Sequence, residues 1–442
     1  MSMVIALVGR PNVGKSTLFN RLTGSRDSLV SDYAGLTRDR IYGRGRFRQH
    51  HFIVIDTGGL TAQDDTINKQ LQAQAQMAME EADIILFLVD GRSGENPDDA
   101  RIAQRLRRMK KKVCLVVNKL EASDPQIACS EFYRLGLGEP YPLSAAHGTY
   151  MDSLLESICA EAGEKKDQHV DEQIDPGIRI ALIGRPNVGK STLVNRLLGE
   201  ERQVTADQSG TTRDSVAIPF EKDGQHFTLI DTAGIRRRGR ISETVEKFSV
   251  VKSLQALEAC HVALIMLDAQ QEVAEQDIRL IGYALEAGRG IVVAVNKWDH
   301  LSRDQKNDIE RELDRRLDFL DFAPIHQISA LHGNGIQDVL QSASRVYEAA
   351  RQEITTGALN RSLQRALENH APPMVNGRRP KMRFAYQGGV NPPLFIINGS
   401  GMQKVKNSYR RYLEKHFRKE FGLFGTPIKL VFKNTDNPYD PK

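Results

Sequence analysis

Short apolar runs alternate with stretches of helical periodicity along most of the chain. The runs at 4–8, 52–55, 84–89 and 113–117 are brief and rich in β-branched residues, which is typical of buried parallel strands. Stretches with helical spacing, at 66–82 and 98–109, lie between them. The alternation starts again with runs at 178–183, 227–230, 262–267 and 291–295. This pattern predicts two doubly wound α/β domains with parallel sheets.

An internal repeat relates the two halves of that pattern. The segment 8–18 returns almost unchanged at 183–193. Four further landmarks return in the same order: Gly35–Asp39 as Gly210–Asp214, Asp56–Gly59 as Asp231–Gly234, Asn118-Lys119 as Asn296-Lys297, and Ser144-Ala145 as Ser329-Ala330. Landmarks repeated at a domain-sized spacing indicate a tandem duplication rather than a solenoid.

The remaining stretch has a different order of elements. We expect a helix at 359–368, strands at 382–387 and 394–397, a helix at 402–420 and a closing strand at 428–432, which is a small α+β domain compatible with RNA binding. The expected division is domain 1 at 1–160, an acidic linker at 161–177, domain 2 at 178–351 and a basic domain at 352–442. The linker holds six acids against two lysines, and its alternative is a short surface loop.

Charge sets the C-terminal stretch apart from the rest. The whole chain carries +5, but residues 357–442 hold 16 Lys+Arg against 5 Asp+Glu, so the rest is net negative. Such a basic module indicates a polyanionic partner or, alternatively, only a solvated basic face. Four scattered cysteines favour free thiols in a reducing compartment. No secretory signal is visible, and no apolar run approaches the roughly 20 residues of a membrane span. We therefore expect a cytoplasmic protein without stable membrane association.

A GxxxxGK[ST] motif follows the first strand of each copy, which is the context that identifies a P-loop. Its glycines let backbone N–H groups face phosphate oxygens at the start of a helix. We expect Lys15 and Lys190 to reach the β- and γ-phosphates, and Ser16 and Ser191 to bind Mg²⁺. The expected phosphate-binding residues are Gly9, Arg10, Pro11, Asn12, Val13, Gly14, Lys15, Ser16 and Thr17, and Gly184, Arg185, Pro186, Asn187, Val188, Gly189, Lys190, Ser191 and Thr192.

An aspartate, Asp56 or Asp231, ends the next strand of each copy, and a Walker-B Asp holds Mg²⁺ in P-loop NTPases. Its alternative role as a helix cap fits the repeated spacing less well. Thr37 and Thr212 are expected to complete the Mg²⁺ shell when γ-phosphate is present, in a loop that relaxes after hydrolysis, or else to stabilise a turn. We expect Lys15, Thr37 and Asp56, with Lys190, Thr212 and Asp231, to serve catalysis. The residues expected beside the γ-phosphate are Thr57, Gly58, Gly59 and Leu60, and Thr232, Ala233, Gly234 and Ile235.

A third pair of motifs predicts the base. A carboxylate such as Asp299 accepts paired hydrogen bonds from guanine N1–H and N2–H₂, which adenine does not offer. The first copy has Glu121 instead, one methylene longer, so affinity or selectivity is expected to differ between the sites. Ser144-Ala145 and Ser329-Ala330 would contact the base through the backbone. The remaining base-site residues are Asn118, Lys119 and Leu120, and Asn296, Lys297 and Trp298.

Together these motifs resemble those of the EngA/Der family of tandem-domain ribosome-assembly GTPases, over essentially the whole chain. The resemblance implies GTP and GDP as ligands, Mg²⁺ as cofactor, two GTPase domains, a KH-like C-terminal domain, and action on the large ribosomal subunit and its rRNA. A monomer is the expected state. Leu60 and Ile235 stand where Ras-type enzymes carry a water-orienting Gln. Related GTPases bind K⁺ beside the phosphates through the P-loop Asn, here Asn12 and Asn187, which alternatively only stabilise the turn.

The KH-like domain departs from nucleic-acid-binding KH modules, because Asn398–Gly401 lacks the spacing of their GxxG loop. Seven basic residues are expected on one helix and could meet rRNA phosphates: Lys404, Lys406, Arg410, Arg411, Lys415, Arg418 and Lys419. The alternative is that this domain docks on a GTPase domain. Arg236–Arg238 and Arg240, in the second copy, could reach RNA, reach the basic domain's acids or lie in a solvated loop.

The sequence therefore predicts a slow GTPase whose nucleotide state gates binding to the immature large subunit. The rival hypothesis is a scaffold in which one of the two sites binds guanine nucleotide permanently and does not cycle. The Glu121 departure makes domain 1 the preferred candidate for that site. A GTPase acting on tRNA or a membrane lacks a supporting motif in this chain.

Overall fold

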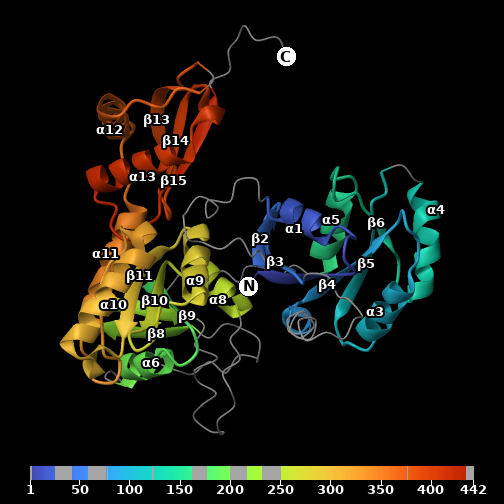
Figure 1. The fold of residues 1–442 in the computed structure, drawn as a ribbon, viewed down its shortest axis with the longest axis horizontal. Helices are drawn as coiled ribbons and strands as arrows, with labels where there is room; N and C mark the ends of the chain where they lie inside the picture. The colour runs from blue at the N-terminus through green and yellow to red at the C-terminus, as the bar shows by residue number, and fades with distance from the viewer. Residues whose placement is uncertain are drawn as a thin grey trace. The chain divides into compact units, whose positions relative to one another are not determined.

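The computed structural model, drawn in Figure 1, describes residues 2–24, 42–57, 76, 78–121, 124–161, 177–199, 217–230, 250–375 and 377–434. The chain divides into two compact units, the first within residues 1–173 and the second built mainly from residues 174–442.

A six-stranded sheet, ordered β2-β3-β1-β4-β5-β6, forms the centre of the first unit. Helices α1 and α5 cover one face, where Leu18 and Ile158 pack against Ile5 and Leu86 of the sheet. The strands are β1 (Met3–Val8), β2 (Tyr42–Phe47), β3 (His50–Asp56), β4 (Ile84–Asp90), β5 (Lys112–Asn118) and β6 (Tyr141–Pro142). The helices are α1 (Lys15–Leu22), α3 (Pro97–Arg107), α4 (Pro125–Ser130), η3 (Glu131–Leu135) and α5 (Met151–Glu161).

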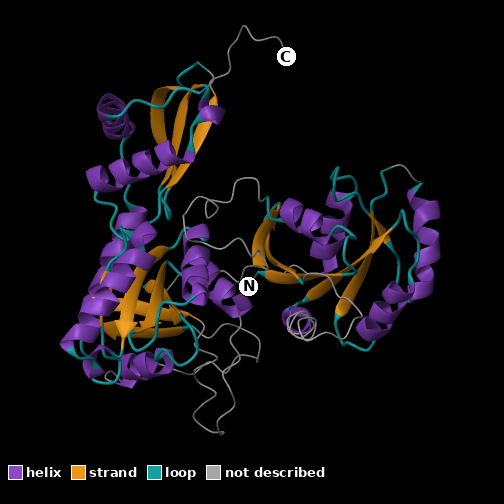
Figure 2. Cartoon of the chain, in the orientation of Figure 1, coloured by secondary structure: helices purple, strands orange, loops and turns teal. Residues whose placement is uncertain are grey.

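The second unit repeats this sheet in the order β12-β11-β10-β7-β9-β8. Helices surround this sheet, as Figure 2 shows. Buried side chains of α6 and α11 pack on one face of the sheet, and those of α8, α9 and α10 pack on the other. The strands are β7 (Ile178–Ile183), β8 (Ile218–Lys222), β9 (Gln225–Ile230), β10 (Val262–Asp268), β11 (Gly290–Asn296) and β12 (Ile325–Gln327). The helices are α6 (Lys190–Gly199), α8 (Val250–Ala259), α9 (Glu275–Glu286), η5 (Trp298–His300), α10 (Arg303–Arg316), η6 (Asp318–Leu320) and α11 (Ile336–Arg351).

Both sheets are doubly wound, as predicted, but neither is wholly parallel. β2 runs antiparallel to β3, and β8 runs antiparallel to β9. The sequence pattern missed β2 because it contains Gly43 and Gly45, which ordinarily weaken a strand. Here the glycines make room: a Cβ at Gly43 would overlap the Phe19 ring, and one at Gly45 would overlap Phe52.

The C-terminal module, from α12 to β15, completes the second unit with a three-stranded sheet ordered β13-β14-β15. Strand β14 is antiparallel to β13 and parallel to β15. Helices α12 and α13 pack on the sheet through Leu363, Leu413 and Phe417, which are all fully buried. The elements are α12 (Thr356–Asn369), β13 (Lys381–Gly389), β14 (Leu394–Ser400), η7 (Met402–Lys404), α13 (Asn407–Phe421) and β15 (Lys429–Asn434).

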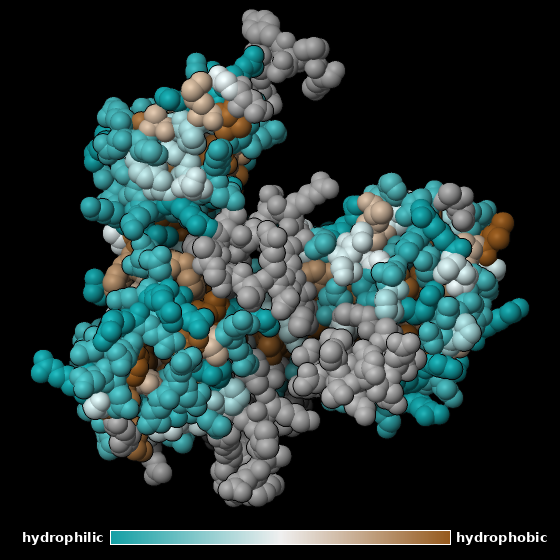
Figure 3. Space-filling view, in the orientation of Figure 1, coloured by the Kyte–Doolittle hydropathy of each residue, from teal (hydrophilic) through white to brown (hydrophobic). Residues whose placement is uncertain are grey.

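The expected helix at 402–420 is wrong at its start. A separate 3₁₀ turn covers Met402–Lys404, the backbone is extended at Val405 and Lys406, and α13 begins only at Asn407. Lys404 and Lys406 therefore do not lie on α13. The expected helix at 66–82 and the linker at 161–177 lie mostly outside the described residues. No helix in the described part of the chain has the length and apolar character of a membrane span, and hydrophilic residues dominate the face in Figure 3.

Candidate nucleotide-binding sites

Each P-loop lies at the carboxyl end of the first strand of its copy. In the first copy, β1 lies between β3 and β4, so the loop opens at the point where the strand order reverses, the usual ligand position in doubly wound folds. Asn12 and Gly14 have left-handed φ angles of 66° and 98°, and Asn187 and Gly189 repeat them at 64° and 103°. A Cβ at Gly14 would overlap the Asn118 amide nitrogen, so only glycine fits there.

Each P-loop lysine folds back over its own loop. Lys15 Nζ donates to Gly9 O at 3.0 Å and to Arg10 O at 2.5 Å, and Lys190 bonds the equivalent carbonyls of Gly184 and Arg185. Burial lowers the pKa of Lys15 to about 8; nearby Asp56 opposes this shift and Arg10 adds to it. The ammonium is thus held inside the loop that the sequence assigns to phosphate.

The first copy brings two predicted Mg²⁺ ligands together. The Ser16 hydroxyl donates to Asp56 Oδ2 at 3.0 Å, so the P-loop oxygen lies directly beside the carboxylate at the end of β3. Such hard oxygen donors suit Mg²⁺, which keeps several waters and phosphate oxygens in its shell. The residues present therefore fit the ion. In the second copy Ser191 is described, whereas Asp231 lies outside the described residues.

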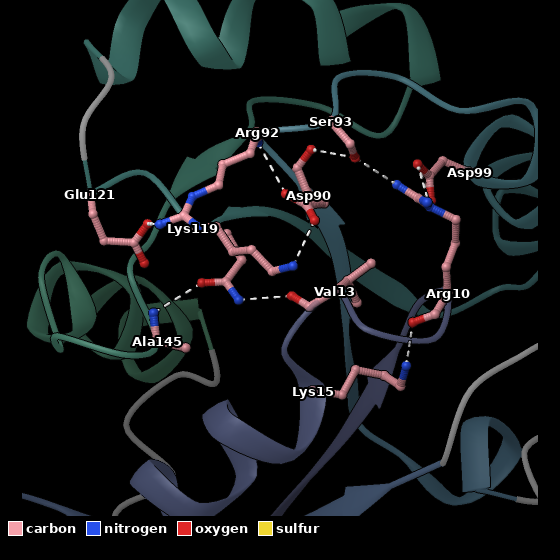
Figure 4. Close-up of polar contacts among 11 residues, drawn as sticks. Arg10, Val13, Lys15, Asp90, Arg92, Ser93, Asp99, Lys119, Glu121 and Ala145 are labelled. Carbon is pink, nitrogen blue, oxygen red and sulfur yellow. Dashed lines mark hydrogen bonds and ion pairs between the residues drawn. The ribbon is translucent and has the colours of Figure 1, made fainter.

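Asn118 connects the P-loop to the last loop of the site. Its Nδ2 donates to Val13 O at 2.8 Å, and its Oδ1 accepts from Ala145 N at 2.9 Å (Figure 4). Asn296 makes the same two bonds, to Val188 O at 2.7 Å and from Ala330 N at 2.8 Å. In each copy the buried amide therefore connects the loop predicted to bind phosphate with the loop predicted to contact the base, and the backbone N–H of Ala145 or Ala330 donates to it.

The lysine of each Asn-Lys pair supports the preceding strand. Lys119 Nζ bonds Asp90 Oδ2 at 2.7 Å, and Lys297 Nζ bonds Asp268 Oδ2 at 2.6 Å. Burial alone would raise the pKa of Asp90, but the Lys119 ammonium and backbone amides hold it below its usual value. Asp90 and Asp268 were not predicted as site residues, although both recur at the offset of the Asn-Lys pair.

The two base-site carboxylates have different neighbours. Glu121 Oε1 accepts from the Ser144 hydroxyl at 3.0 Å, and Oε2 accepts from Arg92 at 2.8 Å. Burial acts to raise the pKa of Glu121, but its own backbone amide, Ser144 and Arg92 together lower it. In the second copy, Asp299 Oδ2 lies 3.3 Å from His332 Nε2.

A buried ion pair behind each P-loop escaped the sequence interpretation. Arg10 Nε donates to both oxygens of Asp99, which is fully buried on α3, at 2.9 and 3.0 Å. Arg185 and Asp277 on α9 form the same pair at 2.9 Å. The repeat contains the signal, because both arginines and both aspartates recur, but nothing in a single copy links residues so far apart.

The other predicted residues either lie near the P-loop and the Asn-Lys motif or fall outside the described part of the chain. Thr57 is buried, and its hydroxyl donates to Leu7 O at 2.7 Å; Leu120 is also buried, while Lys306 lies 6.0 Å from the Trp298 ring. The predicted residues outside the described part are Thr37, Gly58, Gly59, Leu60, Thr212, Asp231, Thr232, Ala233, Gly234 and Ile235, together with Arg236–Arg238 and Arg240.

The C-terminal module docks on the second nucleotide-binding fold. Lys415 and Arg418 of α13, two of the seven basic residues that could meet rRNA, face Asp321, and the Arg418 guanidinium lies 4.1 Å from the Phe322 ring centroid. Gly425 O accepts from Ile291 N of β11 at 2.8 Å, and Gly425 N donates to Phe322 O at 3.1 Å. The segment 398–401 lies largely within β14, so it forms no KH-type backbone clamp.

Comparisons with known proteins agree with this geometry. A family model described as "50S ribosome-binding GTPase" matches residues 4–119 and again 179–297, and one described as "KH-domain-like of EngA bacterial GTPase enzymes, C-terminal" matches 353–433. GTPase Der of Thioalkalivibrio sulfidiphilus (strain HL-EbGR7) is 52% identical over 442 residues, covering 100% of this chain and 95% of the relative. GTPase Der of Marinomonas sp. (strain MWYL1) is 50% identical over 444 residues, covering 100% of both.

Solved structures match less well. The FeoB G-domain from Methanococcus jannaschii is 28% identical and covers 36% of this chain and 96% of that one, with a TM-score of 0.28. Aquifex aeolicus Era bound to GDP and AlF4⁻ is 23% identical and covers 64% of this chain and 100% of that one, with a TM-score of 0.33.

Proposed function

The chain belongs to the Der family of GTPases, and from this premise we propose that it acts as an assembly factor in biogenesis of the large ribosomal subunit. The observation that carries the proposal is the duplicated site, in which Asn118 and Asn296 each join a P-loop to a base-recognition loop. Two copies of this connection in one chain suit a protein that binds guanine nucleotide at two sites. The match to a family described as ribosome-binding supports the choice of target.

In each site the chain's own residues bind and orient the nucleotide. Backbone N–H groups of the P-loop and the lysine ammonium hold the phosphates, while Glu121 or Asp299 accepts hydrogen bonds from guanine. Ser16 and Asp56, with Thr37, would hold Mg²⁺, which neutralises charge on the β- and γ-phosphates when bound. Ser191, Asp231 and Thr212 would do so in the second site. Since Leu60 and Ile235 cannot orient water, we expect slow turnover by the isolated protein.

Potassium is the proposed accelerator. Asn12 and Asn187 are exposed at the P-loops in a left-handed conformation, which leaves their side chains accessible to a cation beside the phosphates. Hydrolysis by the purified protein should be faster in KCl than in NaCl, and Asn12→Ala with Asn187→Ala should abolish the difference. Equal rates in both salts would exclude this role.

Nucleotide state is proposed to gate subunit binding by a monomeric, cytoplasmic protein, organised as two GTPase domains (1–160 and 178–351), a linker (161–177) and the KH-like domain (352–442). Basic residues of the KH-like domain other than Lys415 and Arg418, such as Arg411 and Lys419, remain candidates for rRNA phosphates. The test is co-sedimentation of the full chain with large subunits in GDP or a non-hydrolysable GTP analogue. Binding with the analogue alone supports gating, whereas equal binding or none removes it.

A second candidate function is a scaffold in which domain 1 binds nucleotide statically. It is favoured by Glu121, whose carboxylate is held from two sides in domain 1. Lys15→Ala and Lys190→Ala, each in the full chain, separate the two functions. A static first site predicts that Lys15→Ala leaves the hydrolysis rate unchanged while Lys190→Ala abolishes it; two cycling sites predict that each substitution removes part of the rate.

A further inference from the structure

The residues two positions beyond β4 and β10 are equivalent in the two copies but differ in chemistry. Arg92 N donates to Asp90 Oδ1 at 3.0 Å, and Gln270 N donates to Asp268 Oδ1 at the same distance. Each turn is also tied to the neighbouring strand, by Gly91 N to Asn118 O and Ala269 N to Asn296 O. Arg92 and Gln270 thus leave the same backbone turn, so their side chains can be compared directly.

Only the first copy combines an arginine at this turn with a glutamate at the base position. The Arg92 guanidinium donates to Glu121 Oε2 at 2.8 Å (Figure 4). The Ser144 hydroxyl donates to Glu121 Oε1 at 3.0 Å. The Glu121 side chain is 17% exposed and that of Arg92 is 64% exposed, so a largely buried carboxylate is paired with an arginine that stays open to solvent. The second copy has the shorter Asp299 and the uncharged Gln270.

We propose that Arg92 is a positioning residue for guanine recognition in the first site, where it holds the longer Glu121 carboxylate in place for guanine. Glutamate has one more rotatable bond than aspartate, and fixing that bond costs conformational entropy when guanine binds. A charge-assisted hydrogen bond fixes the bond in advance. Each carboxylate oxygen keeps a second lone-pair direction, so the pair still accepts guanine N1–H and N2–H₂.

The inference rests on the proposed base site, so both are tested with the full chain carrying Lys190→Ala, which confines binding to the first site. The probe is GDP, titrated by calorimetry. Arg92→Ala should weaken GDP binding about fivefold, near the upper end of what an ion pair with one exposed partner contributes. The preference for GDP over IDP should fall as well. IDP lacks the 2-amino group, and a carboxylate that is not held in place forms a weaker hydrogen bond to that group of GDP.

A second background separates positioning from a general structural effect. With Glu121→Asp already present, Arg92→Ala should change GDP affinity less than about twofold, because aspartate needs no such support. Added NaCl should weaken GDP binding to the Arg92 protein more than to the Arg92→Ala protein, since salt screens an exposed ion pair. Gln270→Ala, in a chain with Lys15→Ala, is the matched control and should leave the second site unchanged.

The outcomes are distinguishable. If Glu121→Ala leaves GDP affinity unchanged, the proposed base site itself fails. If Glu121→Ala weakens binding but Arg92→Ala does not, only the role of Arg92 is overturned. An equal loss from Arg92→Ala with glutamate or with Glu121→Asp also overturns it, because the arginine would then act independently of side-chain length.

Discussion

Lys415 on α13 pairs with Asp321 of the second nucleotide-binding fold, with 2.8 Å between Nζ and Oδ2. The two side chains are 77% and 42% exposed, so the pair contributes at most about 1 kcal/mol. Lys415, for which the sequence left rRNA contact and docking as alternatives, therefore lies at a docking surface that must be stabilised mainly by other contacts. The backbone at Gly425 supplies them, through hydrogen bonds to both Ile291 and Phe322.

Gly425→Ala should loosen this docking. Gly425 has φ +62°, and a Cβ there would overlap the Val346 side chain and approach Ile291 O and Pro324. Left-handed strain and overpacking together should cost roughly 2–4 kcal/mol. Gly422→Ala is the matched control, because its φ is +64° but its Cβ would meet nothing within 4 Å among the described residues. It should cost only about 1 kcal/mol. Denaturant unfolding of the full chain checks this, and equal losses would contradict tight docking at Gly425.

Asn118→Ala should impair the first site by removing the hydrogen bonds that connect the P-loop to the loop containing Ala145. The change removes the bonds to Val13 and Ala145 and leaves two buried backbone groups without this partner, at roughly 1–3 kcal/mol each. We expect at least tenfold weaker GDP binding at the first site, measured by calorimetry with Lys190→Ala present. Asn296→Ala is the counterpart for the second site. GDP affinity unchanged by either substitution would show that the amide does not hold the site together.

Arg10→Ala should destabilise the first unit by about 3–5 kcal/mol, because it leaves the buried Asp99 carboxylate unpaired. Burial already raises the pKa of Asp99, and Arg10 opposes that shift. With a raised folded-state pKa, stability falls as pH rises through the interval between the unfolded and folded values. The variant should therefore regain stability as the pH is lowered toward the unfolded-state pKa of about 3.9, as urea unfolding would show. Arg10→Ala combined with Asp99→Ala should be less destabilised than Arg10→Ala, and an equal or greater loss would refute this account.

His326→Tyr should remove part of the acid sensitivity of the second unit. Burial lowers the pKa of His326, although Asp338 opposes the shift, and its Nε2 lies 2.8 Å from the Ser342 hydroxyl. A lowered folded-state pKa means that the unfolded chain binds more protons, so stability is lost as pH falls below about 6.5. The first copy has Tyr141 bonded to Ser157 in the equivalent place. Thermal unfolding between pH 7 and 5 should show a smaller loss for the variant, and an identical loss would contradict this role.

The repeat explains why much of the fold was predictable. Buried strands such as β4 and β10 consist almost entirely of apolar residues, and both copies place the same motif at the same strand end. The antiparallel edge strand β2 was missed because its glycines provide space for Phe19 and Phe52, which only the packed structure shows.

At the candidate sites, too, the sequence predicted local motifs but not contacts between distant residues. The P-loop and Asn-Lys motifs are local, so their residues could be named from the sequence. The partners that hold them lie far away in the chain: Asp99 is 89 residues from Arg10, and Arg92 is 29 residues from Glu121. Likewise, the charge of Lys415 and Arg418 indicated an anion but could not distinguish a phosphate from the Asp321 carboxylate.

Strand β11 carries contacts at both of its ends. Its second residue, Ile291, donates its backbone N–H to Gly425 O of the C-terminal module, and its last residue is Asn296 of the second predicted site. Seven residues of extended chain span roughly 20 Å and resist stretching. β11 therefore connects the docked C-terminal module to the predicted base-recognition loop of the second copy, so the docking contact and the expected nucleotide contact lie at opposite ends of one strand.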